Sequence, residues 1–325
     1  MVAESSHGAT TERQEVLSMK NRGSRQKKIE TISALKRKDA VKGYLFLSPF
    51  IIGFFGFIML PILTSIGLSF TNWNTLSTPR FCGADNYVHL LTENPYFWGS
   101  LSSTLLYALG GTVLPIIWSL LMALALNANI KLRAFFRTCF YIPCLVPVVS
   151  TSILWMWMYN PEFGLFNNVL DFLHLPRLEW IYNESTVIPS LWLMAIWGCG
   201  STVVVFLASL QGIPTELMEA VEMDGGGALA KFHAVTLPFL SPILSFNFLM
   251  GIIGAIQVYA PAAIMTGGGP NNKTLFLTYY IYGLAFSQYR MGYACALAVI
   301  TFIVILFFTG IFNRLTSKLV FYNEG

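Results

Sequence analysis

The sequence predicts an all-α integral membrane protein with six transmembrane helices. The first observation is compositional: 55% of the 325 residues are hydrophobic and only 11% are charged, against about a quarter in soluble proteins. The second is positional, because every Lys, Arg, Asp and Glu lies outside six long uncharged stretches. Each stretch exceeds the ~20 residues that a helix needs to cross a hydrocarbon core of ~30 Å. An ordinary soluble enzyme is thereby excluded.

The charged residues that bracket these stretches place the helices. We expect spans near 44–70, 100–127, 138–159, 187–210, 238–265 and 292–313. Basic residues set the orientation, because positively charged loops next to a span stay in the cytoplasm. With the N-terminus inside, 16 of the 20 Lys and Arg are cytoplasmic, and the external ones are Arg80, Arg177, Lys273 and Arg290. Both termini are therefore predicted to be cytoplasmic.

The chain divides into a polar N-terminal segment and a membrane domain. Residues 1–42 are rich in basic residues, and two interpretations stay open: a short interfacial helix containing Ile29, Ile32 and Leu35, or a solvated basic tail. The first apolar stretch is too long for the core of a signal peptide and is expected to remain as an anchor. Residues 43–325 form the predicted six-helix domain, which includes a polar cytoplasmic loop at 212–238.

The sequence contains no motif for catalysis or for the binding of ATP. The predicted spans contain no ionisable Asp, Glu, Lys or Arg, which argues against a secondary carrier or a self-sufficient membrane enzyme. There is no GxxxxGK[ST] phosphate-binding motif, and the four His and five Cys lack metal-ligand spacing. We therefore expect no catalytic residue, metal, cofactor or nucleic-acid partner for this chain. Energy for active transport would have to come from another subunit.

The cytoplasmic loop at 212–238 has the pattern of two short helices joined by a glycine turn. Thr215 is expected to cap the first helix, and the turn at 225–227 to supply positive φ. A second helix is expected over 228–235. The first helix carries an apolar stripe formed by Leu217, Ala220 and Val221. Such a stripe can lie on lipid or enter a groove of a partner, and the acidic charge of the loop favours the partner because the cytoplasmic leaflet is negative.

The residues of this loop resemble a known family. Glu219-Ala220-Val221, then Asp224-Gly225, and Val235-Thr236-Leu237-Pro238 downstream are similar to the EAA loop of binding-protein-dependent ABC importer permeases. Val221, Gly226 and Val235 depart from the usual Ala, Ala and Ile. The resemblance implies a type I ABC importer (MetI-like) permease fold in which this loop is a coupling helix docked on an ATPase. The coupling residues it implies are Glu219, Ala220, Val221, Asp224, Gly225, Leu237 and Pro238.

Two further stretches resemble sugar-uptake permeases similar to the larger maltose-importer subunit. Ser69–Trp73 with Cys82–Tyr87 is similar to their first external loop, and Thr266–Pro270 with Gly292–Ala296 is similar to the loop and start of their last span. The resemblance implies import of a sugar, with oligosaccharides such as alginate fragments as the cargo class. A permease for a non-sugar solute such as a glycerol phosphodiester is the alternative. The residues implied to contact a docked binding protein are Gly267, Gly268, Gly269 and Pro270.

The resemblance also implies partners and a location. The charged N-terminal extension and the ending at 320–324 are similar to the first of the two permease chains of such importers. This implies a pseudo-twofold heterodimer with a second homologous permease in the bacterial cytoplasmic (inner) membrane, surrounded by lipid. Two ATPase subunits would hold ATP and Mg²⁺, and an extracytoplasmic solute-binding protein would deliver the sugar.

Candidate substrate-pathway residues come from the fourth and fifth spans, which flank the coupling loop. Helical spacing predicts that Met194, Trp197, Gly198 and Ser201 share one face, with an indole that can stack on a sugar ring. Core packing or lipid contact is an equal alternative for Trp197. The fifth span supplies small and amide side chains, namely Asn247, Gly251, Gly254 and Gln257, although small residues also serve close helix packing. Trp155, Trp157 and Tyr159 are expected to form an aromatic belt at the outer interface.

Overall fold

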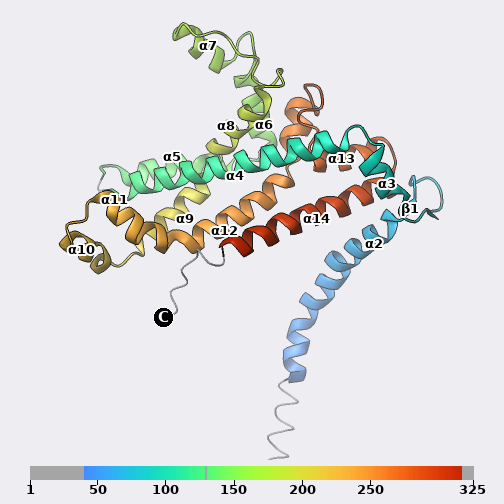
Figure 1. Cartoon of the computed structure of the whole chain (residues 1–325), viewed down its shortest axis with the longest axis horizontal. Helices are drawn as coiled ribbons and strands as arrows, with labels where there is room; N and C mark the ends of the chain where they lie inside the picture. The colour runs from blue at the N-terminus through green and yellow to red at the C-terminus, as the bar shows by residue number, and fades with distance from the viewer. Residues whose placement is uncertain (1–39, 129, 317–325) are drawn as a thin grey trace, which may run out of the picture. The chain divides into compact units, whose positions relative to one another are not determined.

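The computed structural model describes residues 40–128 and 130–316 (Figure 1). The chain divides into two compact units at Thr64. The described part of the first unit, residues 40–64, belongs to the helix Ala40–Ser69. This helix contains the π-helical turn η1 (Phe54–Met59) and ends with α2 (Leu60–Ser69). The predicted N-terminal segment up to residue 39 and the ending at 320–324 lie outside the described residues.

The second unit begins with a small antiparallel ribbon and continues as helices. β1 (Thr71–Asn72) pairs with β2 (Arg80–Phe81), with Thr71 opposite Phe81. The remaining elements are, in chain order, α3 (Asp85–Thr92), α4 (Phe97–Asn127), α5 (Arg133–Leu145), α6 (Val148–Met158), α7 (Leu165–Phe172), α8 (Val187–Trp197), α9 (Gly200–Gln211), α10 (Thr215–Met223), α11 (Ala228–Lys231), η2 (Phe232–Thr236), α12 (Leu237–Ile256), η3 (Ala262–Thr266), α13 (Leu277–Tyr282), η4 (Gly283–Ser287) and α14 (Met291–Thr316).

The membrane spans are of two kinds. Four helices in the described part of the chain are long and apolar enough to cross a bilayer: Ala40–Ser69, Phe97–Asn127, Ala228–Ile256 and Met291–Thr316. Two further pairs pass the same test together but are bent, α5 with α6 by 101° and α8 with α9 by 50°. Counting each bent pair as one span gives up to six. The spans expected near 138–159 and 187–210 are thus each formed by two helices with a bend between them.

Each interruption has a local cause. Val146 is extended, with ψ 128°, because the ring of Pro147 disfavours helical backbone at the preceding residue. Between α8 and α9, Gly198 and Cys199 leave the helical region with ψ values of 1° and 10°. The fifth span ends at Ile256 instead of 265, since the ring of Pro261 would clash with the carbonyl four residues earlier in a continued helix.

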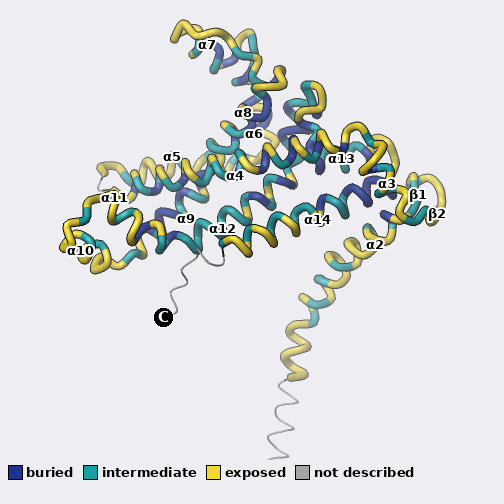
Figure 2. Tube along the Cα trace, in the orientation of Figure 1, coloured by how far each residue is buried: buried dark blue, intermediate teal, exposed yellow. Residues whose placement is uncertain are grey.

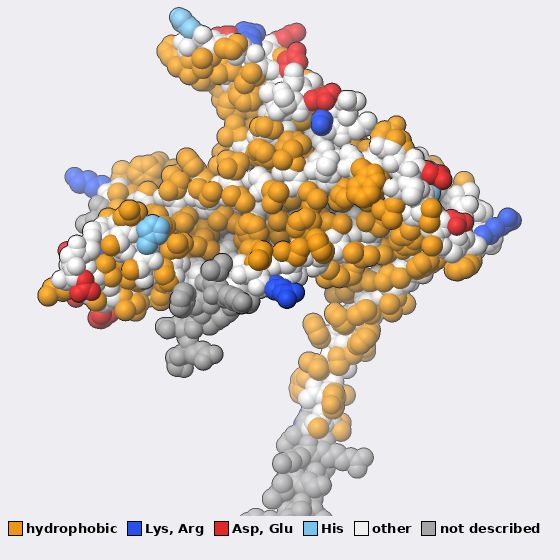
Figure 3. Space-filling model, viewed as in Figure 1, with side chains coloured by type: hydrophobic (Ala, Val, Ile, Leu, Met, Phe, Trp, Pro, Cys, Tyr) orange, Lys and Arg blue, Asp and Glu red, His pale blue; other side chains and the backbone are white. Residues whose placement is uncertain are grey.

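Helices α4, α12 and α14 lie side by side, and α4 also packs against α8 and α9 (Figure 1). Buried residues lie where these helices face one another (Figure 2), as in the cluster of Phe206, Leu207 and Leu240. Hydrophobic side chains cover the flank of the bundle, whereas charged groups gather near its ends and around α7 (Figure 3). Exposed leucines such as Leu109 and Leu121 of α4 belong to this flank. A surface of this kind suits lipid or another membrane chain.

The ribbon is held against the beginning of the last span. The backbone N–H of Gly292 donates to the carbonyl of Trp73 at 3.0 Å. A Cβ atom at position 292 would overlap the carbonyl oxygen of Thr71, so only glycine permits this approach. The ribbon and the start of α14 therefore form one packed end of the bundle, although they are far apart in sequence.

Candidate functional site

The predicted coupling loop folds as α10, a glycine turn and a continuous helix. α10 ends in a Schellman motif, in which the N–H of Gly226 donates to Val221 O at 2.8 Å and the N–H of Gly225 donates to Glu222 O at 2.9 Å. Gly225 has φ +80°, the left-handed value that this motif requires. The predicted turn is confirmed, but of the three glycines only Gly225 has positive φ.

Two details of the loop differ from expectation. Thr215 is the first residue of α10 and makes no capping hydrogen bond, because Pro214 occupies the cap position. No separate helix spans 228–235: α11, η2 and α12 are continuous over Ala228–Ile256. Leu237 and Pro238 therefore lie inside one helix that joins the turn directly to the fifth span.

An ion pair ties α10 to this continuous helix. Lys231 Nζ donates to Glu222 Oε2 at 2.7 Å across the glycine turn. The hydrogen bond from Lys231 holds the pKa of the Glu222 carboxyl below its usual value, so this carboxyl is ionised at neutral pH. The ion pair therefore links α10 to the helix Ala228–Ile256 that follows it.

Most of α10 is exposed. Leu217 and Met223 are 47% and 88% exposed, and Leu229 beyond the turn is 72% exposed. Glu219 and Ala220, from the predicted motif, are exposed beside them, whereas Val221 is half-buried. The described residues thus leave a mixed apolar and acidic surface uncovered at this end of the bundle.

The predicted pathway residues of the fourth span straddle the break between α8 and α9. Trp197 is the last residue of α8, and Ser201 lies in α9 beyond the 50° bend. The expectation that Met194, Trp197, Gly198 and Ser201 share one helical face was wrong for this reason. Met194 is buried, whereas Trp197, Gly198 and Ser201 are exposed.

Trp197 lines an aromatic pocket of about 470 Å³ beside this break. Its walls include Trp118, Phe140 and Trp155, and the Trp155 and Trp197 rings meet edge to face with centroids 5.9 Å apart. Trp155 is 3% exposed, and its indole N–H has no hydrogen-bond partner among the described residues. The expected aromatic belt is therefore wrong for Trp155 and for the fully buried Tyr159, while Trp157 is exposed.

The predicted residues of the fifth span are divided between packing and open surface. Gly251 faces α4, since a Cβ there would lie 2.8 Å from Thr112 Cγ2. The side-chain amide of Asn247 donates a hydrogen bond to the carbonyl of Ile243 at 2.8 Å. Gly254 has open space beside it, and Gln257 is exposed. None of these four residues lines the aromatic pocket around Trp197.

The loop predicted to meet a binding protein is a tight turn. Gly267 and Gly268 have φ +59° and +89°, and Thr274 Oγ1 donates to Gly269 O at 2.7 Å. Gly267 is exposed, Gly269 and Pro270 are half-buried, and Gly268 is buried against Tyr279. Of the four predicted residues, Gly267 alone is therefore exposed.

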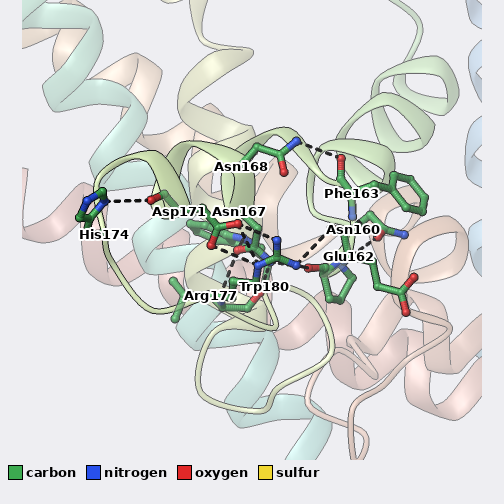
Figure 4. Close-up of polar contacts among 11 residues, drawn as sticks. Asn160, Glu162, Phe163, Asn167, Asn168, Asp171, His174, Arg177 and Trp180 are labelled. Carbon is green, nitrogen blue, oxygen red and sulfur yellow. Dashed lines mark hydrogen bonds and ion pairs between the residues drawn. The ribbon is translucent and has the colours of Figure 1, made fainter.

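The segment between α6 and α8 is organised around one buried asparagine (Figure 4). Asn167 Nδ2 donates to the carbonyls of Pro161 and Leu178, both at 3.0 Å, and its Oδ1 accepts from Leu178 N at 3.1 Å and from Trp180 Nε1 at 2.9 Å. Arg177 Nη2 pairs with Asp171 Oδ2 at 2.6 Å, and this hydrogen bond lowers the pKa of the Asp171 carboxyl. The sequence carried no signal for this network beyond the turn-forming Asn160-Pro161.

Comparison with known proteins supplies an independent observation. Residues 115–321 match the family described as "Binding-protein-dependent transport system inner membrane component". The probable ABC transporter permease protein YesP of Bacillus subtilis (strain 168) is 35% identical over 89% of this chain and 94% of its own length. The arabinooligosaccharides transport system permease protein AraP of the same organism is 33% identical over 87% of this chain and 90% of its own.

A solved structure shares the fold. It is a chain of the crystal structure of a bacterial alginate ABC transporter in complex with an alginate pentasaccharide-bound periplasmic protein. The TM-score is 0.75 over 87% of this chain and 96% of that chain, at 22% sequence identity.

Proposed function

The chain belongs to the family of binding-protein-dependent transport system inner membrane components, and from this premise we propose that it is a permease subunit of an ATP-driven sugar importer. Oligosaccharides are the proposed cargo, because relatives of this length are named for arabinooligosaccharides and for trehalose and maltose. ATP and Mg²⁺ would be held by separate ATPase subunits. A second homologous permease and an extracytoplasmic binding protein would complete the importer.

The uncovered side of α10 is the observation that carries the coupling proposal. Exposed Leu217, Met223 and Leu229 would not be left in water next to acidic groups without a partner surface. Lipid is a poor cover, because the anionic cytoplasmic leaflet repels Glu216 and Glu219. A groove on an ATPase that accepts a short amphipathic helix fits both the apolar and the acidic groups.

The connections of α10 suggest how movement would be transmitted. On one side it follows α9 and the break at Gly198 and Cys199, and on the other it is tied by the Glu222–Lys231 pair to the continuous helix Ala228–Ile256. A displacement of α10 by a closing ATPase would therefore act directly on α12. It would also tilt α9 relative to α8 at the break, next to the aromatic pocket. Two such subunits rocking around a midplane site give alternating access.

The cargo pathway is proposed to pass this pocket. Trp197 and Trp118 offer ring faces for stacking on a pyranose, and the unpaired indole N–H of Trp155 can donate to a hydroxyl. The lining is otherwise apolar, so the polar groups that a sugar also needs would come from the second permease chain.

Photo-cross-linking tests the coupling role. A photoreactive amino acid at Met223 in the complete importer, in proteoliposomes, is expected to attach to the ATPase subunit. Leu217→Asp is expected to abolish sugar-dependent ATP hydrolysis and uptake, because it adds a charge to the docking surface, while the sugar affinity of the binding protein stays unchanged.

A matched control is available at the other end of the bundle. Leu76 is 86% exposed in the loop between β1 and β2, and Leu76→Asp is expected to leave ATP hydrolysis intact. Cross-linking of Met223 to lipid alone, or full uptake by the Leu217→Asp importer, would overturn the coupling role of α10.

A further inference from the structure

A second pocket of about 450 Å³ lies at the external end of the bundle. It is formed by the residues around α3, the start of α4, the 267–275 turn, α13 and η4. Its size is at the small end of ligand pockets, which span about 300–1,000 Å³. Unlike the pocket around Trp197, it combines aromatic rings with many polar groups. Its principal side chains are His89, Asn94, Tyr96, Tyr279, Tyr280 and Arg290.

The floor of this pocket is a fixed hydrogen-bond network. Asn94 Nδ2 donates to the hydroxyls of Tyr280 at 2.7 Å and Tyr293 at 2.8 Å, and His89 Nδ1 lies 2.8 Å from the Tyr293 hydroxyl. The Asn94 orientation is set by its Oδ1, which accepts the backbone N–H groups of Tyr96 and Phe97. These bonds join the segment before α4 to α13 and α14.

The network leaves one buried donor unused. Tyr280 is 6% exposed, and its hydroxyl receives a hydrogen from Asn94. Because the Asn94 amide is itself the donor, the Tyr280 proton has no acceptor among residues 40–128 and 130–316. A buried hydroxyl proton at the floor of a pocket is positioned for an oxygen atom of a ligand.

The charged group that lines the pocket is a guanidinium. Arg290 lines it and no carboxylate does in the described part of the chain, while Glu93 Oε2, 3.5 Å from His89 Nε2, lies outside the lining. The Arg290 guanidinium lies 4.3 Å from the centre of the Tyr293 ring and makes no ion pair with any described residue. Stacking on an aromatic face holds a guanidinium in place while its N–H edges stay free to bind a carboxylate in bidentate geometry.

We infer that this pocket is an external binding site for a sugar unit that carries a carboxylate. Arg290 would bind the carboxylate, the Tyr280 hydroxyl would donate to a ring or hydroxyl oxygen, and the half-exposed Tyr96 ring and Tyr279 would pack on the apolar face of the pyranose. An apolar ligand would leave the polar groups at the floor of the pocket without hydrogen-bond partners. The inference rests on the proposed sugar-import function and narrows its cargo to acidic oligosaccharides.

Equilibrium binding to the assembled importer in nanodiscs, without binding protein and without nucleotide, tests this site. The probes are digalacturonic acid and its neutral counterpart galactobiose. The acidic disaccharide is expected to bind at least about tenfold more tightly, because a charge-assisted hydrogen bond to a carboxylate adds that much. Arg290→Gln is expected to bring the two affinities together, Arg290→Lys to retain part of the preference, and Tyr280→Phe to weaken both probes.

The control is Arg80→Gln, which removes another external arginine outside the pocket and is expected to keep the preference. Equal affinities for the two probes, no binding of either, or a preference that survives Arg290→Gln would each overturn the site. The same holds if Arg290→Gln weakens only docking of the binding protein, because the pocket would then serve a protein carboxylate. In each of these cases, ATP-driven uptake of a sugar by the unmodified importer would leave the proposed function standing although the site fails.

Discussion

Replacing Asn167 by alanine is expected to loosen the whole segment between α6 and α8. The side chain is fully buried and makes four hydrogen bonds, to Pro161, Leu178 and Trp180. At about 1 kcal/mol each, their loss lowers the free energy of local opening by about 3–4 kcal/mol. Backbone amide hydrogen exchange across residues 160–186, measured on the assembled importer, is therefore expected to accelerate by two to three orders of magnitude, about tenfold per 1.4 kcal/mol.

The adjacent asparagine is the matched control. The Asn168 side chain is exposed and makes a single hydrogen bond, to Phe163 O at 3.4 Å. Asn168→Ala is therefore expected to lower the free energy of local opening by about 0.5 kcal/mol or less. Exchange in the Asn167→Ala protein that equals wild type, or that is matched by Asn168→Ala, would refute the assignment of Asn167 as the centre of this segment.

Three further predictions concern a helix contact, the coupling turn and pH. Gly200→Ala would place a methyl group on the carbonyl of Phe140, and we expect a loss of about 1–3 kcal/mol, visible as a lower temperature of aggregation in detergent. Gly225→Ala forces φ +80° on a side chain at a cost of about 1–2 kcal/mol without a steric clash, so the protein should remain folded while ATP-driven uptake slows. The hydrogen bond from Arg177 lowers the pKa of the Asp171 carboxyl, so protection of backbone amides from exchange in the segment between α6 and α8 should be constant from neutral pH to about pH 4 and fall below it.

Each of these has a result that would contradict it. Gly227 has ordinary φ and open space around it, so Gly227→Ala should transport like wild type, and equal slowing by both glycine variants would remove the role of positive φ. Unchanged thermal stability of Gly200→Ala would show that α5 and α9 separate without cost. An Asp171→Asn protein with the same acid sensitivity as wild type would assign that sensitivity to another carboxyl.

The membrane character of the fold could be predicted from hydropathy and charge, because burial in lipid is a property of whole helices. The interruptions could not. Gly200 reads as one more small residue in an apolar run, and its role becomes visible only when Phe140, from another span, is brought against it. Pro147 was a weak signal, since prolines such as Pro115 lie inside helices of the same chain.

The functional regions follow the same division. The Asp224-Gly225 turn was predictable because the requirement for positive φ is local. Tyr159 was assigned to the membrane interface because the sequence does not show that its hydroxyl donates to Ser190 O at 2.7 Å or that Trp180 stacks on its ring. The external pocket was missed for a similar reason, as Asn94 and Tyr280 meet only through tertiary packing.

The contact between Gly292 and Trp73 sets an order on biogenesis. At about 5–20 residues per second, a ribosome produces Gly292 roughly 10–45 s after Trp73. Until then the ribbon lacks the surface of α14 on which it packs. The packing of this end of the bundle is therefore completed last, and a chain with a bulkier residue at position 292 could not form this contact even after synthesis is complete.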